Sequence, residues 1–228
     1  MKNSNDIDFI YEKLSRKYPQ YSNRKPKAKI YSKAYTSLIG VMLSAQSQDK
    51  RTAMACRQLF ALADNPEDMI KLSREEIIEA IRPAGLHNAK SKNILGTSKI
   101  LLDKFNGRVP QTQKELMTLP GVGRKSSDIV MRFVWGQPNI AVDTHVFRLL
   151  WRLGWVDNLN EAKASITVNN STPDRYKYGA HMWLITHAKL VCRSSSPGCD
   201  DCVIKPTCDQ RDLKVPKSKL RQHQKTPL

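Results

Sequence analysis

Apolar residues recur every three or four positions along most of this chain, which is the spacing of one face of an α-helix. The first amphipathic segment contains Ile7, Ile10 and Leu14, and residues 35–50 form a more uniformly apolar segment with a polar end. The helical period continues through residues 50–62, 66–71, 74–81, 88–105, 124–135, 142–155, 160–168 and 174–190. Alternating strand-like segments are nearly absent. The pattern therefore predicts an all-α fold in which helices pack on helices.

Short polar breaks separate these segments and predict where helices end. The breaks contain residue types that favour turns and helix caps: Asn65-Pro66, Ser73 and Pro83-Ala84-Gly85. Val109-Pro110 is expected to begin a further short helix. Residues 24–33 form a basic segment broken by Pro26, which predicts a linker. Residues 212–228 are basic and poor in apolar side chains, which is typical of a tail outside a folded core.

Charge adds an expected partner to this picture. The 228 residues include 38 Lys and Arg against 21 Asp and Glu, a net charge of +17. This excess favours a polyanionic partner such as nucleic acid, and a well-solvated basic surface is the simpler alternative. The first residues are not those of a secretory signal, and no stretch is apolar enough to span a membrane. We therefore expect a soluble cytoplasmic protein that is associated with the nucleoid.

Four of the five cysteines are close together in sequence. Cys192, Cys199, Cys202 and Cys208 have the spacing C-x6-C-x2-C-x5-C in a loop of polar residues. Neighbouring thiolates repel one another unless a cation holds them, so the pattern indicates a metal site. Zinc usually takes two short-spaced pairs, whereas an iron–sulfur cluster tolerates unequal spacings, and the spacing alone leaves both open. Cys56 lies in an apolar helical segment and is expected in the core.

The stretch LPGVGRKSSDIV, residues 119–130, predicts a sharp turn before a helix. Pro120 and Gly121 suit the central positions of a type II turn. Gly123 would let the chain enter the helix without a side chain in the way. The backbone N–H groups of Gly121, Val122, Gly123 and Arg124, next to a helix N-terminus, can form an anion site. A plain joint between two helices is the alternative.

Lys125 is expected in the first turn of that helix. The helix dipole disfavours a cation at this end, so a purely structural lysine is unexpected here. The dipole and the neighbouring Arg124 both favour the uncharged amine, which is the form that a nucleophile needs. The alternative is a lysine that only contacts phosphate. Asp128, three residues later on the helix, could pair with Lys125 and oppose this effect.

Asp143, in the stretch VDTH, is expected at a helix N-cap, where its carboxylate would accept backbone N–H bonds. A carboxylate is also what a sugar needs beside it when positive charge develops on that sugar. The two roles are compatible, and the sequence alone favours the structural one. His145 could contact DNA or merely complete the capping turn.

Taken together, these motifs resemble the endonuclease III family of DNA base-excision glycosylases, in the helix-hairpin-helix superfamily. The resemblance covers roughly residues 5–211 and rests on LPGVGRK, VDTH and the cysteine pattern in that order. It implies a six-helix barrel over residues 26–137 that contains the hairpin. It also implies a second helical domain, from residues 1–25 and 138–211, with a [4Fe–4S] cluster on the four cysteines. The active site would lie in the cleft between these domains.

The resemblance further implies roles for single residues. Lys125 would attack C1′ of the sugar under a flipped-out base, expel the base, form a Schiff base and nick the strand by β-elimination. Asp143 would stabilise positive charge on the sugar. Gln46, in SAQSQD, and Leu86, in GLHNAK, would enter the base stack from two sides. The expected substrate is double-stranded DNA that contains oxidised pyrimidines or abasic sites, and the expected enzyme is a monomer.

The chain departs from the family pattern in two places, and the first of these, Asp128, keeps other functions open. Asp128 stands close to the lysine, and the loop between Cys192 and Cys199 has Arg193 as its only basic residue. A non-catalytic protein that binds damaged DNA is one alternative. A monofunctional glycosylase, in which Lys125 only binds DNA, is the other.

Overall fold

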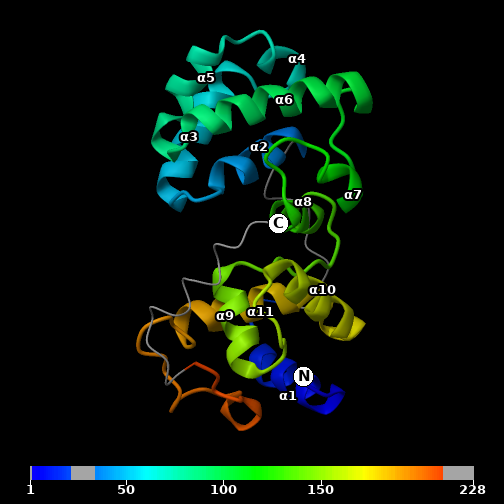
Figure 1. The fold of residues 1–228 in the computed structure, drawn as a ribbon, viewed down its shortest axis with the longest axis vertical. Coiled ribbons are helices and arrows are strands. Elements are labelled where there is room, and N and C mark those ends of the chain that lie inside the picture. Colours follow the sequence, from blue (N-terminus) through cyan, green and yellow to red (C-terminus); the bar gives the residue numbers. More distant parts are fainter. Residues whose placement is uncertain (1, 22–33, 213–228) are drawn as a thin grey trace. The chain divides into compact units, whose positions relative to one another are not determined.

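The computed structural model describes residues 2–21 and 34–212, and the regular structure in these ranges is all helical (Figure 1). The α-helices are α1 (Ser4–Lys17), α2 (Ala34–Ser44), α3 (Asp49–Leu62), α4 (Pro66–Met69), α5 (Arg74–Ile81), α6 (His87–Phe105), α7 (Gln113–Leu116), α8 (Arg124–Phe133), α9 (Thr144–Leu153), α10 (Glu161–Ser171) and α11 (Lys177–Leu190). The 3-10 helices are η1 (Arg82–Ala84), η2 (Asp174–Tyr176) and η3 (Lys205–Thr207). The prediction of an all-α fold is confirmed. The predicted linker at 24–33 and the predicted tail beyond residue 212 lie outside the described residues.

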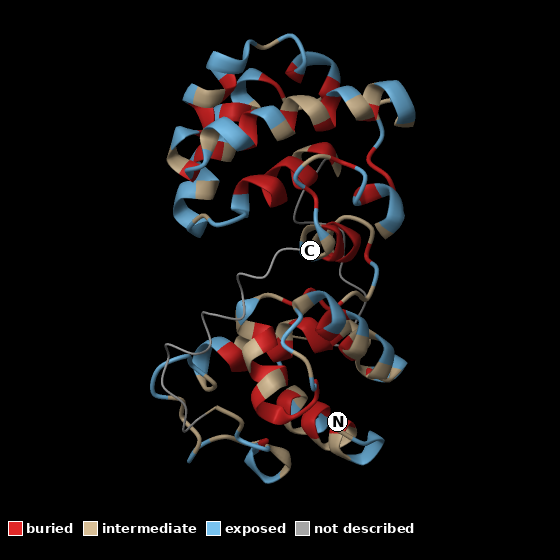
Figure 2. Ribbon diagram, viewed as in Figure 1, coloured by how far each residue is buried: buried red, intermediate tan, exposed pale blue. Residues whose placement is uncertain are grey.

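The helices group into two compact units, each with its own hydrophobic core (Figure 2). We call residues 34–138, which contain α2 to α8, the hairpin unit. We call residues 2–21 together with 139–212 the cysteine unit, which contains α1 and α9 to α11. Each unit is described separately below.

The core of the hairpin unit is built around α2, whose residues from Leu38 to Leu43 are all buried. This helix is apolar on every side because it packs against α3, α6 and α8. Two of the predicted breaks are helix caps: the side chain of Asn65 accepts a hydrogen bond at the start of α4, and Ser73 forms a capping box at the start of α5. The polar breaks therefore set the helix boundaries, as the sequence predicts.

The helix predicted to begin at Val109-Pro110 begins later. The structure starts α7 at Gln113, and Thr112 is its N-cap. Val109 is buried, and the carbonyl of Pro110 accepts a hydrogen bond of 2.9 Å from the Trp135 side chain. These contacts hold the segment in a non-helical conformation, so a tertiary contact overrides the local pattern.

The cysteine unit joins the beginning of the described chain to its end. Tyr11 of α1 is fully buried, contacts the Trp155 ring edge-on and forms a 2.7 Å hydrogen bond with the Thr172 hydroxyl. α9 packs against α10 and α11, and α11 packs against α1. The core of this unit therefore needs α1 as well as the later helices. None of the helices in the described ranges has the length and apolarity that a bilayer crossing needs.

Candidate active site and cysteine cluster

The chain turns sharply before α8. The N–H of Val122 donates to the carbonyl of Leu119 over 3.1 Å, and Gly121 has a φ of 76°. With Pro120 before Gly121, these values fit a type II turn, which confirms the predicted turn. α8 follows directly after Gly123, which is its N-cap.

α6 supports this turn from behind. The Thr97 hydroxyl donates to the carbonyl of Pro120 over 3.2 Å, and a Cβ atom added at Gly96 would lie 3.3 Å from the Pro120 ring. A Cβ atom at Gly121 would lie 2.6 Å from the Asn93 amide nitrogen, in addition to its positive φ. Glycine at position 121 is therefore required by the protein itself.

Gly123 differs from Gly121. Its φ of −89° suits any residue, and a Cβ atom added there would meet no atom within 4 Å. The prediction that a side chain would obstruct entry into the helix is therefore wrong, because the space beside Gly123 is open. Gly123, as the N-cap, has no side chain that could accept hydrogen bonds from the first N–H groups of α8. Open space beside uncapped N–H groups suits a ligand atom that approaches the backbone closely.

Lys125 lies in the first turn of α8, and its side chain is exposed. Within the described part of the chain it makes no ion pair and no side-chain hydrogen bond. Asp128, which the sequence suggested as its partner, is buried and accepts a 2.6 Å hydrogen bond from the Gln113 amide. The Gln113 oxygen in turn accepts from Arg124 over 3.0 Å. Asp128 thus helps to bind α7 to α8 and leaves the amine of Lys125 accessible.

A groove of about 830 Å³ lies among α2, α3 and α8. Its lining includes Ile129 and Phe133, which follow Lys125 by four and eight residues and so lie on the same face of α8. The lining is mainly apolar, and the hydroxyl of Thr52 has no hydrogen-bond partner within the described part of the chain. This size and composition are typical of a small-molecule or nucleobase pocket. Cys56, predicted to be a core residue, is only half-buried and also lines the groove.

Gln46 and Leu86 share an unusual backbone conformation. Both have positive φ angles, 53° and 50°, although neither is glycine. Gln46 is exposed, and Leu86 is 56% exposed. A bulky residue in the left-handed region is uncommon and costs of order 1–3 kcal/mol, and such residues cluster at functional sites. Both residues belong to the hairpin unit.

Asp143 belongs to the cysteine unit and is the N-cap of α9. One oxygen of its half-buried carboxylate accepts hydrogen bonds from the N–H of His145 at 2.9 Å and of Val146 at 2.8 Å. The predicted cap is confirmed. The His145 ring lies 3.5 Å from the guanidinium of Arg148. Arg148 also donates to the carbonyls of Cys192 and Ala188, so α9 is bound to the beginning of the cysteine loop.

The four predicted metal ligands line one small cavity between α9 and the loop that follows α11. They are Cys192, Cys199, Cys202 and Cys208, and all four are half-buried. Burial raises the pKa of Cys202, and it raises the pKa of Cys208 to about 11. The thiols of Cys202 and Cys208 therefore stay protonated unless a cation compensates their thiolate charge.

Polar groups contact the sulfur atoms. Arg152 donates to Cys192 over 3.5 Å, and the N–H of Gln210 donates to Cys208 over 3.4 Å. His187 is fully buried and lies 3.3 Å from Cys202 through Nε2 and 3.1 Å from the Tyr18 hydroxyl through Nδ1. Burial lowers the pKa of His187 to about 4, so its ring is neutral. Donors around thiolate sulfur are typical of metal-bound cysteines.

The arrangement of the thiols bears on which metal group they fit. Among the described residues, no three Cys, His, Asp or Glu side chains converge closely enough to bind one metal ion. The four thiols nevertheless surround the same cavity. A single tetrahedral ion needs its ligands about 2.3 Å from one point, whereas a multi-iron cluster takes one thiolate at each iron. Four thiols around one cavity provide the complete ligand set that either kind of group needs.

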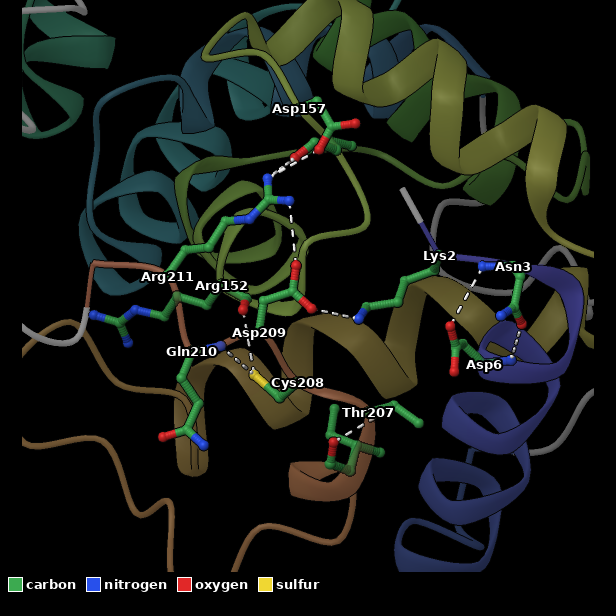
Figure 3. A network of polar contacts seen from close by, with 12 residues as sticks. Lys2, Asn3, Asp6, Arg152, Asp157, Thr207, Cys208, Asp209, Gln210 and Arg211 are labelled. Atoms are coloured by element: carbon green, nitrogen blue, oxygen red, sulfur yellow. Dashed lines mark hydrogen bonds and ion pairs between the residues drawn. The ribbon is translucent and has the colours of Figure 1, made fainter.

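The residues after Cys208 fasten the cysteine loop to the rest of the unit (Figure 3). The Asp209 carboxylate pairs with Lys2 at 2.7 Å and with Arg211 at 3.2 Å. Arg211 also pairs with Asp157 at 3.0 Å. Gly154, which ends α9 with a φ of 75°, leaves room for Asp209, since a Cβ atom at position 154 would overlap with that carboxylate. The end of the loop is thus joined to α9 and to the start of α1.

Each predicted site residue can now be assigned to a unit. The hairpin unit contains Gln46, Leu86, the turn 121–124 and Lys125, and the cysteine unit contains Asp143, His145 and the four cysteines. Three further residues, Ile129, Phe133 and Gln113, belong to this region but carry no motif that identifies them in the sequence. For the first two the helical spacing from Lys125 was a usable signal, but Gln113 is recognisable only from its contacts in three dimensions.

Comparisons with known proteins give matches over most of the chain. The sequence profile of the HhH-GPD superfamily of base excision DNA repair proteins matches residues 39–170. The chain is 37% identical over 186 residues to Endonuclease III of Buchnera aphidicola subsp. Baizongia pistaciae. The aligned residues cover 82% of this chain and 86% of that protein. The chain is 36% identical over 182 residues to Endonuclease III of Escherichia coli strain K12, which covers 80% and 86%.

Solved structures give the same picture. A trapped endonuclease III–DNA covalent intermediate is similar with a TM-score of 0.82 and 32% identity, covering 92% of this chain and 97% of that chain. A non-covalent endonuclease III–DNA complex is similar with a TM-score of 0.81 and 29% identity, covering 99% of this chain and 100% of that chain. A thermostable thymine-DNA glycosylase shares the fold, with a TM-score of 0.73 and 20% identity.

Proposed function

The chain belongs to the endonuclease III family of the HhH-GPD superfamily of base excision DNA repair proteins, and on that premise we propose what its residues do. It is a DNA glycosylase and abasic-site lyase. We propose that its substrate is double-stranded DNA with an oxidised pyrimidine or an abasic site, and that it acts as a monomer. The amine of Lys125 is exposed at the start of α8 and has no partner among the described residues, and this is the observation that supports the proposal best.

The turn before α8 is proposed to bind the DNA backbone. The uncapped N–H groups at the start of α8 point to an anion, and the open space at Gly123 lets a phosphate approach them closely. Arg124 adds a positive charge, while its contact with Gln113 fixes its direction. These groups neutralise phosphate without reading the sequence of the bases.

Lys125 is proposed to be the nucleophile. Its uncharged amine attacks C1′ of the damaged nucleotide, a C–N bond forms, and the bond from C1′ to the base breaks. The base leaves with the electron pair of that bond and takes up a proton. The sugar ring then opens to give a Schiff base on Lys125. Removal of a proton from C2′ expels the 3′ phosphate, so the strand is nicked on the 3′ side.

Asp143 is proposed to act on the charge of the sugar. One of its oxygens already accepts two backbone N–H bonds, which fixes the direction of the carboxylate. A fixed carboxylate stabilises the positive charge that develops at C1′ and can exchange protons with the base or the sugar. His145, next to this carboxylate, is proposed to contact the DNA backbone.

The groove on the Lys125 face of α8 is proposed to take the extruded base. Ile129 and Phe133 would pack against the base, and the unpartnered Thr52 hydroxyl would bind a polar edge. Gln46 and Leu86 would fill the space that the base leaves in the stack. Their exposed side chains on left-handed backbone support this role, because strained exposed residues are typical of positions that contact a ligand.

The four cysteines are proposed to hold a [4Fe–4S] cluster. They line one cavity, they supply the four thiolates that such a cluster takes, and they include Cys192 and Cys202, which Arg152 and His187 contact. When bound, the cluster supplies a cross-link that closes a loop with too few apolar residues to fold alone. The chain's own contribution is the set of donors that surrounds the sulfur atoms.

Borohydride reduction on abasic-site DNA tests the proposed chemistry. A Schiff base on Lys125 is reduced to a stable covalent adduct, which is resolved by size on a denaturing gel. Lys125→Ala should give no adduct. Lys114→Ala, which removes an exposed lysine from α7 of the same hairpin, should retain it. An adduct that persists in Lys125→Ala would mean that another amine is the nucleophile. If the unmodified chain forms no adduct, the protein is a monofunctional glycosylase or a non-catalytic DNA-binding protein.

A further inference from the structure

Lys90 is a buried lysine in the hairpin unit. It lies in the first turn of α6 and is only 6% exposed. Its ammonium donates to the carbonyl of Leu43 over 2.8 Å and to the carbonyl of Ala84 over 3.1 Å. Lysine is rarely buried, because removing its charge from water is costly unless fixed acceptors replace the water. The two carbonyls are those acceptors.

The two carbonyls belong to the two segments with left-handed residues. Leu43 is in the last turn of α2 and precedes Gln46 by three residues, and Ala84 ends η1 and precedes Leu86 by two residues. These segments are far apart in sequence. One side chain therefore connects the backbones that lead to Gln46 and Leu86.

The turn after α2 does not use the Leu43 carbonyl as a hydrogen-bond acceptor, so this carbonyl is available to Lys90. In the turn after α2, the N–H of Ala45 donates to Met42 and the N–H of Ser47 donates to Ser44, so that turn uses the carbonyls on either side of Leu43. Carbonyls in the last turn of a helix lack intrahelical donors and must find others. Lys90 supplies such a donor. Burial lowers the pKa of Lys90, in keeping with an ammonium whose water has been replaced by carbonyls.

We propose that Lys90 is a positioning residue that holds the backbones of Gln46 and Leu86 at a fixed separation and in their left-handed conformations. This proposal rests on the proposed function, in which these two side chains enter the base stack. Left-handed conformations of non-glycine residues persist only where surrounding contacts determine them. Small displacements of a positioning group are sufficient to slow a reaction by roughly 100-fold.

The experiment compares two substrates that differ in their need for stack insertion. Lys90→Met keeps the length and apolar stem of the side chain but removes the donors. We expect single-turnover strand cleavage at an abasic site in duplex DNA to fall roughly 10- to 100-fold. Cleavage of the same abasic strand without its complement should stay within roughly 2-fold of the unmodified chain, because there is no stacked duplex to hold open.

Lys99→Met is the matched control. Lys99 is also on α6 but is exposed, so this variant has the same loss of charge and the same change in helix propensity. It should leave the ratio of duplex to single-strand cleavage unchanged. If Lys90→Met does not fold, Lys90→Gln replaces it, because its side-chain amide can still donate a hydrogen bond. The ratio of duplex to single-strand cleavage is then measured for this variant.

A double-mutant cycle separates positioning from general stability. If Lys90 acts through Leu86, adding Lys90→Met to Leu86→Ala should slow duplex cleavage much less than it slows the unmodified chain. Fully additive effects, or an equal loss on both substrates, would overturn the proposal. An unmodified chain that cleaves neither substrate would instead overturn the proposed function, so the two failures are distinguishable.

Discussion

The single carboxylate of Asp143 has two roles, one structural and one proposed in catalysis. One oxygen caps α9 through two backbone N–H groups, and the proposed chemistry uses the negative charge of the same group. Asparagine retains an oxygen for the cap but has no charge. The two roles can therefore be separated by substitution.

We predict that Asp143→Asn lowers turnover on abasic-site DNA by roughly 100-fold, as expected when an electrostatic group is removed from a reacting centre. Its melting temperature should change little. Asp143→Ala should lower stability by about 1–2 kcal/mol, because the cap is lost as well. Turnover is measured under single-turnover conditions and stability by thermal unfolding. An Asn variant with full turnover would reduce Asp143 to a capping residue.

The roles of some single residues could be predicted from the sequence, and those of others could not. The Asp143 cap and the Gly121 turn follow from local chemistry, and the structure confirms both. Lys90 and Gln113 were missed because their partners are distant in sequence. The suggested pairing of Lys125 with Asp128 was local and plausible, yet the Gln113 amide is the partner seen in the structure.

The turn before α8 contains two glycines that are present for different physical reasons. Gly121 is required by its φ and by Asn93, whereas a Cβ atom added at Gly123 would meet no atom of the described residues within 4 Å. If Gly123 leaves space for phosphate, a substitution there should affect binding without affecting the fold.

We predict that Gly123→Asp retains or slightly raises stability, since Asp is a favoured N-cap and the φ and ψ of −89° and −178° are ordinary for it. Its affinity for abasic-site DNA should fall strongly, because its carboxylate occupies the anion site. Gly123→Asn is the neutral control and should lose less affinity. Fluorescence anisotropy and thermal unfolding measure the two quantities. Unchanged affinity in the Asp variant would disprove phosphate binding at this turn.

The joint between α9 and the cysteine loop offers a second test at this scale. A side chain at Gly154 would overlap with Asp209, which directly follows Cys208. We predict that the unmodified chain purifies with four irons and four sulfides. Gly154→Ala should lose iron to a chelator several-fold faster, which is the change in rate that a free-energy difference of roughly 1 kcal/mol produces. Stoichiometric zinc without sulfide would contradict the cluster.

Gly85→Ala is the matched control for this joint. Gly85 has a similar φ of 69°, but a Cβ atom there would meet nothing within 4 Å. Its ψ of 169°, against 21° at Gly154, makes a side chain at least as costly for the backbone there, but without the overlap, and it lies in the hairpin unit. Its iron should be retained as in the unmodified chain. Equal iron loss in both variants would mean that crowding at Asp209 is not the cause.

At the scale of the whole molecule, the charge of +17 is the main sequence signal for a DNA partner. We predict that affinity for duplex DNA falls steeply with salt, with a slope of log affinity against log salt of about −0.9 for each phosphate contacted. Titration at several salt concentrations measures this slope. A slope near zero would mean that the basic residues do not contact phosphates. The groove among three helices, by contrast, could not be predicted, because its shape depends on packing.

The division of the chain also has a consequence for its synthesis on the ribosome. Residues 34–138 are contiguous, so this unit can fold while translation continues. α1 is translated before this unit, but the elements that it packs against, α11 and η3, are translated after it. A chain that stops early therefore has no closed cysteine loop. If the four cysteines hold a cluster as proposed, the complete ligand set is available only after elongation has passed Cys208, which follows both α1 and the hairpin unit in the chain.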